Sequence, residues 1–226
     1  MITVFGEGRG FRVVWLLEEM GLPYRLRPVD LLGEVEHDAE FLAINPAGFI
    51  PAIRDGEVTM VESIAIMEYL MARHGPTPLA PDPHDPAFPA YQQFLHLGEA
   101  GLAAPINLVV ATRLLAPAAE QQNWGTQKAL ETFTSRLGLV TRRLAETPFL
   151  AGDSFTAADI SVTYALQLAQ RTGCFALGEP EQAYVARTTA RDACDRAMET
   201  CQAMKAWAAE VEAMAATVAK PIAGAE

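Results

Sequence analysis

The pattern of apolar and polar residues predicts two parts with different secondary structure. In the first part, short apolar runs at residues 2–5 and 24–29 have the length and composition of strands. A helical pattern at residues 11–20 lies between them. A strand, a crossover helix and a second strand imply that the two strands pair in parallel.

The remainder of the first part predicts a short helix, a hairpin and a longer helix. The short helix covers residues 38–44. Asp55-Gly56 lies between the apolar runs PAI and VTMV and is a dipeptide that often closes a β-hairpin. A helix over residues 63–73 follows and ends at Gly75. The order βαβ, α, ββα predicts a mixed four-stranded sheet with antiparallel strands added by the hairpin.

A proline-rich segment divides the chain. Six of its 15 prolines lie in GPTPLAPDPHDPAFPA, and proline removes a backbone donor and disfavours helix. We therefore expect residues 76–90 to be a semi-rigid linker between a domain at 1–75 and a domain at 91–226. The periodic runs of the second domain are all helical in spacing, at residues 91–116, 125–146, 157–172 and 190–218.

The glycine-rich segment GEGRGFR, residues 6–12, joins the first strand to the first helix. A dinucleotide fingerprint would have glycine where this loop has Phe11, although Asp30 lies at a tolerable distance for its acidic residue. The first part is also too short for the sheet that such a site needs, and the loop has no P-loop lysine. These features argue against a nucleotide site.

The most informative stretch is NPAGFIPAIRDGEVTMVESIAIMEYL, residues 45–70. Proline cannot donate to a sheet ladder, so Pro51 marks an edge or a kink. If the bond before it is cis, the backbone N–H and C=O of Ile50 face outward, towards an extended peptide. Glu62 and Ser63 lie at the mouth of a helix, where Ser caps free N–H groups, those groups attract a carboxylate and Glu can hold an ammonium.

Each of these residues also has an ordinary structural interpretation. Ser63 could be a simple helix cap, Glu62 a solvated charge and Pro51 the start of a strand. Their order and spacing favour a site for one end of a zwitterionic peptide over three separate explanations.

Composition limits the partners. The chain has 17 Lys and Arg against 28 Asp and Glu, which argues against nucleic acid and anionic membranes. Its first five residues are too short for a secretory signal, and no apolar run reaches the roughly 18 residues of a membrane span. Cys174, Cys194 and Cys201 form neither a CxxC pair nor a metal-ligand spacing. We expect a cytoplasmic protein without a metal.

On these motifs the chain resembles the glutathione transferase family over nearly its whole length. FRVVWLLEEMGLPY resembles the family's first helix and second strand, and EFLAINPAGFIPAI with VESIAIMEYL resembles its glutathione-binding stretch. FLAGDSFTAADISV is similar to the motif that opens a central helix, with Thr156 as N-cap and Asp159 three residues later. The resemblance implies an α/β thioredoxin-like N-terminal domain and an all-α C-terminal domain.

The resemblance also implies a function. Glutathione would be the co-substrate, conjugated to a small hydrophobic electrophile or used in a related reaction, in a detoxifying homodimer. A glutathione-binding or protein-interaction module without chemistry is the alternative. The residues implied to bind glutathione are Phe49, Ile50, Pro51, Glu62 and Ser63, with Phe49 where relatives often have Lys or Gln.

The chain departs from the family at the catalytic position. Relatives activate the thiol with a Tyr, Ser or Cys, but residues 5–16, FGEGRGFRVVWL, contain none of these. We therefore expect backbone N–H groups of Gly8 and Gly10, together with the Arg9 guanidinium, to hold any thiolate. Glu7 would oppose this if it pointed inward.

Polar residues on the helix at residues 94–115 suggest a second-substrate pocket in a cleft between the domains. A solvated stripe or a dimer face is the alternative interpretation of each of these polar residues. The residues expected to line it are Phe5, Glu7, Phe11, His96, Glu99 and Arg113.

Overall fold

The structure of the protein is a computed structural model, which describes residues 1–31 and 35–202. The described chain divides into two compact units. One consists of residues 1–88 together with 188–202, and the other of residues 89–187.

The two compact units differ from the two domains predicted from the sequence, which were separated only by the linker. Residues 76–88 belong to the first unit, and so does the segment that begins at Thr188. That segment returns to the first unit because its helix packs on another helix there, a contact between residues far apart in sequence. The functional roles expected for the two domains stay predictions.

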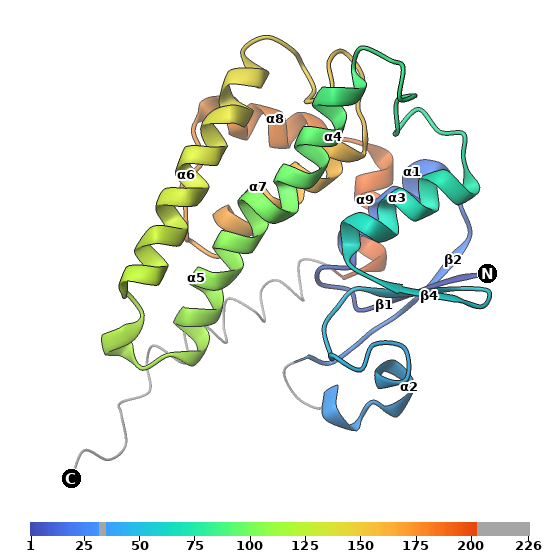
Figure 1. The fold of residues 1–226 in the computed structure, drawn as a ribbon, viewed down its shortest axis with the longest axis horizontal. Helices are drawn as coiled ribbons and strands as arrows, with labels where there is room; N and C mark the ends of the chain where they lie inside the picture. Colours follow the sequence, from blue (N-terminus) through green and yellow to red (C-terminus); the bar gives the residue numbers. More distant parts are fainter. Residues whose placement is uncertain (32–34, 203–226) are drawn as a thin grey trace. The chain divides into compact units, whose positions relative to one another are not determined.

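The first unit contains a four-stranded sheet with strand order β2-β1-β3-β4 (Figure 1). Its strands are β1 (Ile2–Phe5), β2 (Tyr24–Arg27), β3 (Ala52–Asp55) and β4 (Val58–Val61). β1 and β2 are parallel, and the other two pairs are antiparallel, which confirms the predicted mixed sheet. β2 ends earlier than expected because Pro28 has no N–H for the ladder.

Four helices and a turn accompany the sheet. They are α1 (Phe11–Met20), the 3₁₀ turn η1 (Val35–His37), α2 (Ala39–Leu42), α3 (Ser63–His74) and α9 (Asp192–Thr200). In Figure 1, α1 and α3 lie on one side of the sheet and α2 on the other. Every residue of α1 from Phe11 to Leu17 is buried, so this helix is covered on more than its sheet-facing side.

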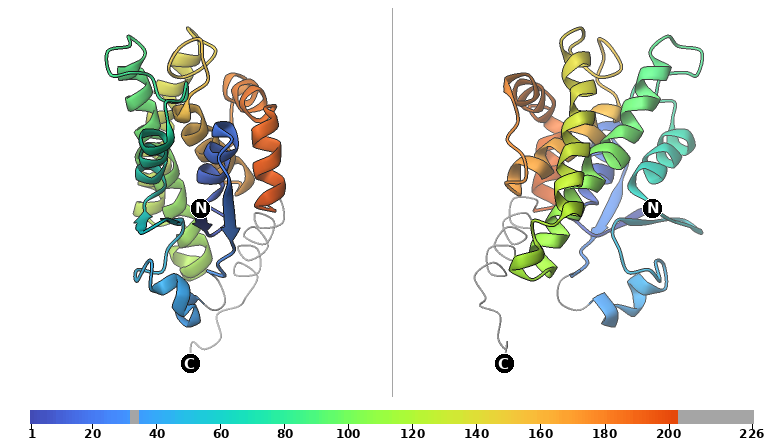
Figure 2. Two further views of the ribbon diagram at one scale, coloured as in Figure 1. Left: turned by 90° about the vertical axis from the view of Figure 1, so that its right-hand side faces the viewer. Right: turned by 60° about the vertical axis from the view of Figure 1, so that its left-hand side comes forward.

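The helix α9 packs beside α1, as the left view of Figure 2 shows. The sequence predicted one helix over residues 190–218. In the structure, α9 begins at Asp192 and ends at Thr200. The part of the prediction from residue 203 onward lies outside the described residues.

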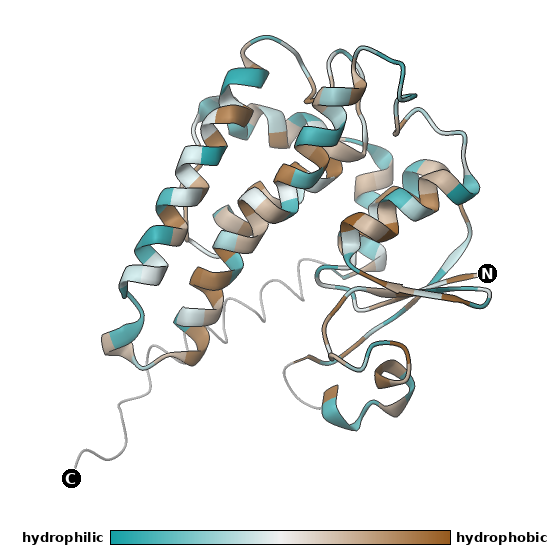
Figure 3. Ribbon diagram, viewed as in Figure 1, coloured by the Kyte–Doolittle hydropathy of each residue, from teal (hydrophilic) through white to brown (hydrophobic). Residues whose placement is uncertain are grey.

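The described part of the second unit contains helices and turns only, as predicted. They are α4 (Phe88–His96), the π-helix η2 (Leu97–Ala103), α5 (Ala104–Leu115), the 3₁₀ turn η3 (Ala118–Glu120), α6 (Trp124–Leu144), α7 (Ala157–Arg171) and α8 (Glu179–Thr189). Nearly all of α7 is buried, so it forms the core of the unit. Figure 3 shows teal and brown segments alternating along α6, as expected for a helix with one polar face.

A π-helix interrupts what the sequence predicted as one α-helix over residues 91–116. Pro105 has no N–H to donate to the carbonyl four residues earlier, so the regular ladder is broken there. A β-carbon at Gly98 would lie 2.2 Å from Ser161 Oγ, which shows how closely η2 approaches α7. Ser161 Oγ donates to the carbonyl oxygen of Leu95 at 2.8 Å.

The continuous run Phe88–Leu115 has 28 residues and a mean hydropathy of 1.4 in its most apolar window. By length and composition it is the one helix in the described residues that could cross a membrane. Half of that window is buried inside the structure, and the core helix of a folded domain passes the same test.

The start of α7 has the expected capping arrangement. Asp159 is fully buried, and its carboxylate accepts the N–H groups of Leu150 at 3.0 Å and Thr156 at 2.8 Å. It also accepts the hydroxyl of Tyr184 on α8 at 2.9 Å. Burial raises the pKa of this carboxyl above its ordinary value. The sequence did not predict α8, because EPEQAYVARTT has too few apolar residues for a clear stripe.

Candidate functional site

Three segments of the first unit meet at one end of the sheet. Phe5, the last residue of β1, pairs with Ala52, so Gly6 continues beside Pro51. β4 ends opposite Ala52 as well, so Glu62 emerges at the same end. The glycine-rich loop, the turn before β3 and the start of α3 therefore lie together.

The turn before β3 is fixed by a buried amide. The Ile50–Pro51 bond is cis, which is the condition for the Ile50 backbone groups to face outward. Asn45 is 3% exposed; its Nδ2 donates to the carbonyl oxygen of Phe49 at 2.5 Å, and its Oδ1 accepts the N–H of Ala47 at 3.1 Å. The site prediction omitted Asn45, although Asn at the first position of a turn was the available signal.

Glu62 has φ 71° and ψ 104°, in a region that non-glycine residues rarely adopt. Such a backbone costs on the order of 1–3 kcal/mol and is typical of functional sites. Glu62, rather than Ser63, is the N-cap residue of α3, and no side chain caps the helix in the described structure. Ser63 itself is buried, with 3% of its surface exposed. The first turn of α3 therefore keeps N–H groups for an anion.

The loop after β1 packs directly on the Ile50 side chain. Gly6 has φ 87° and donates its N–H to the carbonyl oxygen of Arg27 at 2.9 Å. A β-carbon on Gly6 would lie 2.3 Å from Ile50 Cγ2, so a larger residue does not fit. A β-carbon on Gly8 would lie 3.6 Å from Ile50 Cδ1, which is ordinary contact.

The loop ends at Gly10, the N-cap residue of α1. The N–H groups of Val13 and Val14 both donate to its carbonyl oxygen at 2.9 Å. Arg9 is half-buried, and its guanidinium has no hydrogen bond or ion pair with the described residues. The loop proposed as catalytic thus contains a cation that has no partner among residues 1–31 and 35–202.

Glu7 points to a neighbouring segment of the first unit. Its Oε2 accepts the N–H of Val29 at 3.2 Å, and its carbonyl oxygen accepts the N–H of Phe11 at 3.1 Å. Phe5 and Phe11 are fully buried. Glu7 is thus held by its neighbours in the first unit, and the contact of Phe5, Glu7 and Phe11 with a second substrate stays a prediction.

The other three residues expected in the second-substrate pocket lie in the second unit. His96 is exposed at the end of α4, and Glu99 is half-buried in η2. Arg113 Nη1 donates to Cys174 Sγ at 3.3 Å and approaches the carbonyl oxygen of Thr172 at 3.5 Å, so it joins the end of α7 to α5. Their contact with a substrate stays a prediction.

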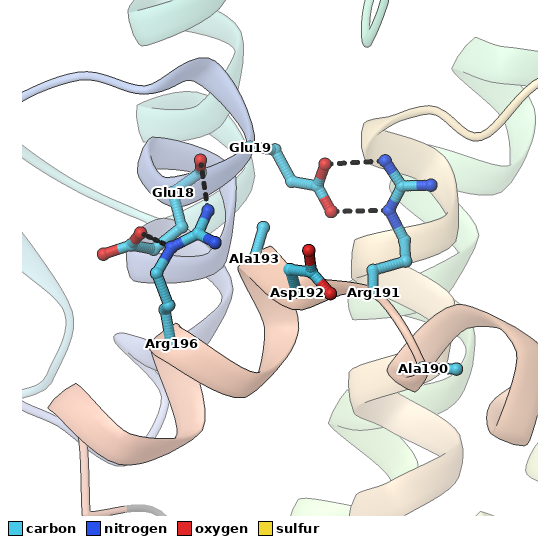
Figure 4. A pocket seen from close by; sticks show the side chains of 7 residues that line it. All are labelled: Glu18, Glu19, Ala190, Arg191, Asp192, Ala193 and Arg196. Carbon is cyan, nitrogen blue, oxygen red and sulfur yellow. Dashed lines mark hydrogen bonds and ion pairs between the residues drawn. The ribbon is translucent and has the colours of Figure 1, made fainter.

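A polar pocket of about 500 Å³ lies between the end of α1 and the start of α9 (Figure 4). Arg191 Nε and Nη2 donate to the two carboxylate oxygens of Glu19 at 2.6 and 2.7 Å. Arg196 Nε donates to Glu18 Oε2 at 2.7 Å. Since these charges are paired with one another, we assign the pocket to the docking of α9 on α1. It is also lined by Ala190, Asp192 and Ala193.

The three cysteines do not replace the missing hydroxyl. Cys174, Cys194 and Cys201 are all free thiols, and all are buried. Burial raises the pKa of Cys194 to about 12 and that of Cys201 to about 12. Both thiols are therefore protonated at neutral pH and unsuited to nucleophilic chemistry.

Comparisons with known proteins point to one family. The family model described as "Glutathione S-transferase, N-terminal domain" matches residues 10–73. Glutathione S-transferase 3 of Schizosaccharomyces pombe is 30% identical over 180 residues, which cover 73% of this chain and 72% of that protein. Glutathione S-transferase GstB of Escherichia coli K12 is 29% identical over 168 residues, covering 72% and 80%.

The fold is shared with solved structures of the same family. The glutathione transferase URE2P6 of Phanerochaete chrysosporium, solved with oxidized glutathione, matches with a TM-score of 0.75 at 23% identity. The match covers 89% of this chain and 96% of that one. By its sheet, its cis-proline turn and its similarity over most of its length, the chain belongs to the glutathione S-transferase family.

Proposed function

We propose that the chain binds glutathione where the three segments meet and conjugates it, through its sulfur, to a small hydrophobic electrophile. The observation that carries this proposal is the convergence of Gly6, the cis Ile50–Pro51 turn and the Glu62–Ser63 helix start. A glutathione transferase-like function agrees with the family membership, whereas a module without chemistry is not favoured.

Each end of the site suits a part of the ligand. The uncapped N–H groups of α3 and the Ser63 hydroxyl would receive the α-carboxylate of the γ-glutamyl group, and the Glu62 carboxylate would receive its ammonium. The backbone of Ile50 would pair with the middle of the peptide. Phe49 is partly exposed beside this turn and would adjoin the glycyl end. The URE2P6 structure, which holds oxidized glutathione, supports this choice of ligand.

The proposed reaction requires a thiolate. The glutathione thiol loses its proton, its sulfur forms a bond to the electrophilic carbon, and the leaving group departs with the bonding electrons. A free thiol has a pKa near 8.5, so only a few per cent is ionised at neutral pH. Lowering that pKa by about two units takes about 2.7 kcal/mol of stabilisation.

The loop offers donors for that stabilisation. The N–H groups of Gly8, Arg9 and Gly10 donate to no backbone carbonyl in the described structure. A charge-assisted hydrogen bond contributes about 1.5–3 kcal/mol, and a helix N-terminus about 0.3–1 more. We assign the thiolate to these backbone groups and the Arg9 guanidinium. Glu7, bonded to the N–H of Val29, has its carboxylate occupied by that contact.

Three further features belong to the same proposal. Detoxification of the electrophile and a two-fold homodimer follow the family resemblance. A cytoplasmic location agrees with the absence of any disulfide among the three cysteines, which are all free. A monomeric mass in light scattering at micromolar concentration would contradict the dimer.

Isothermal calorimetry with glutathione tests the site. Ser63→Ala and Glu62→Ala should each abolish measurable binding, because losing a charged, partly buried hydrogen bond costs about 2–5 kcal/mol. A dissociation constant between micromolar and millimolar corresponds to a binding free energy of only about 4–8 kcal/mol, so either loss would be measurable. Ser135→Ala, at an exposed position on α6, is the matched control and should bind as wild type does. Wild-type affinity in both site variants would place the site elsewhere.

A further inference from the structure

An ion pair in the first unit joins the exit of β2 to the start of α2. Arg27 Nη1 donates to Asp38 Oδ2 at 2.6 Å, and Nη2 donates to Asp38 Oδ1 at 2.8 Å. The two side chains are only 23% and 18% exposed. Paired donors and acceptors of this kind fix orientation as well as distance. Arg27 Nε also donates to Glu40 Oε2 on α2 at 3.2 Å.

Asp38 transmits this restraint to α2. It is the N-cap residue of that helix, and its Oδ1 accepts the N–H of Phe41 at 3.0 Å while also receiving Arg27 Nη2. Hydrogen bonding from Arg27 lowers the pKa of Asp38, so the carboxylate stays charged at neutral pH. α2 has only four residues and lacks the length to be stable by itself.

The other end of α2 leads into the proposed site. Phe41 is fully buried in a cluster with Phe5 and Ile50, and its ring centroid lies 6.2 Å from that of Phe5. Ile50 is the residue proposed to pair with the glutathione backbone. The carbonyl oxygen of Asn45, at the start of the turn, accepts the N–H of Gly48 at 3.0 Å. A shift of α2 would therefore move the turn that presents Ile50.

Arg27 also holds the glycine-rich loop. Its carbonyl oxygen accepts the N–H of Gly6, and its guanidinium lies 5.7 Å from the centroid of the Phe5 ring. Arg27 thus contacts both the loop that begins at Gly6 and, through Asp38, the start of α2, from outside the proposed site.

We propose that Arg27 is a positioning residue for glutathione binding, which acts through Asp38 by holding α2 and the Asn45–Pro51 turn in the binding conformation. This inference rests on the proposed function. Without the pair, α2 would sample conformations that do not bind, and the apparent affinity would fall by the fraction of molecules that remain competent.

The test compares Arg27→Ala, Arg27→Lys and Asp38→Asn with wild type by calorimetry with glutathione. Arg27→Ala should raise the dissociation constant about tenfold or more. Arg27→Lys should rescue only part of this loss, because an ammonium cannot make the paired contact. Asp38→Asn retains a cap for Phe41 and should show a similar but smaller loss. Arg25→Ala, on the exposed face of the same strand, is the matched control.

Two readouts separate positioning from general destabilisation. Hydrogen exchange of unliganded Arg27→Ala should be faster for amides in residues 39–48, with α3 and α7 unchanged. The double variant Arg27→Ala/Asp38→Asn should lose little more affinity than Arg27→Ala alone, because both changes break one pair. In turnover, KM for glutathione should rise with kcat unchanged.

Wild-type affinity and exchange in Arg27→Ala would overturn the inference while leaving the proposed function intact. Failure of the wild-type protein itself to bind glutathione would refute the proposed function. The exchange comparison would then still decide whether Arg27 holds α2.

Discussion

Gly10 faces the carbonyl oxygen of Gly6 so closely that a β-carbon on Gly10 would lie 1.9 Å from it. The glycine is therefore required by packing within the loop itself, whatever the loop binds. Gly8 has no such restriction, because its β-carbon would meet only Ile50 Cδ1 at 3.6 Å.

This difference predicts that two similar substitutions change stability by different amounts. Gly10→Ala should lower the free energy of unfolding by about 1–3 kcal/mol, since the loop must rearrange. Gly8→Ala should change it by less than about 0.5 kcal/mol. Urea denaturation of both variants measures the difference. Equal effects would mean that the Gly6–Gly10 contact is not maintained in solution.

The second prediction concerns the pKa of the bound thiol. Arg9→Ala should raise that pKa by about one unit, because a charge-assisted hydrogen bond to the thiolate is worth about 1.5–3 kcal/mol. The measurement is thiolate absorbance against pH with glutathione bound. Arg25→Ala removes the same charge from an exposed strand position and should leave the titration unchanged. An unchanged titration for Arg9→Ala would leave only the backbone groups, or no activation.

The third prediction concerns the docking of α9. Arg191→Ala should destabilise the protein by about 1–3 kcal/mol, because the Glu19 side chain is 7% exposed and loses two charge-assisted hydrogen bonds. The expected loss of stability is modest because the Arg191 side chain is partly exposed, and water screens part of its interaction with Glu19. Cys194 should also react faster with a thiol reagent, since it lies buried in the first turn of α9.

An exposed ion pair provides the control for α9. Lys128→Ala breaks the pair with Glu131, whose side chains are 58% and 67% exposed, and should change stability by no more than about 0.5 kcal/mol. If Arg191→Ala is equally harmless and Cys194 stays unreactive, the ion pairs do not hold α9 in place.

The fourth prediction concerns the buried cap of α7. Asp159→Ala should cost about 2–5 kcal/mol, since the N–H groups of Leu150 and Thr156 and the Tyr184 hydroxyl lose their acceptor. Asp159→Asn keeps one acceptor oxygen and should cost less. Thermal and urea unfolding measure both changes. A loss below about 1 kcal/mol for Asp159→Ala would contradict a central role for this carboxylate.

The fifth prediction is a pH dependence at the hairpin. Burial acts to raise the pKa of Asp55, but hydrogen bonds from His74 and Tyr69, at 2.7 and 3.1 Å, outweigh it and lower that pKa. Because the folded pKa lies below the unfolded value of about 3.9, the stabilisation is present above that value. It is lost as the pH falls through the folded pKa.

Asp55→Asn should therefore be less stable than wild type by about 0.5–1.5 kcal/mol at pH 6, and the difference should shrink below about pH 4. Urea denaturation between pH 3 and 7 measures this. Glu57→Gln, an exposed carboxylate in the same hairpin, should show no such convergence. A constant difference across the range would contradict the assigned contacts.

Features that depend on local pattern could be predicted from the amino-acid sequence. Asp55-Gly56 predicts the hairpin between β3 and β4, and period and capping residues predict α1, α3 and the start of α7. Pro51 precedes and Glu62 follows the β3–β4 hairpin. Because a hairpin returns the chain to the end of the sheet where it began, the two residues lie close together. A motif whose parts are joined by a short hairpin can be found without a structure.

The polar groups that meet across long sequence separations became known from the folded structure. The Glu19–Arg191 pair joins residues 172 positions apart, and the Glu7 carboxylate accepts the N–H of Val29, 22 positions away. Phe11 is equally apolar whether it faces a substrate or the core, and its complete burial depends on the packing around it. Local periodicity carries no information about such partners, because their contact energies exist only once the chain is folded.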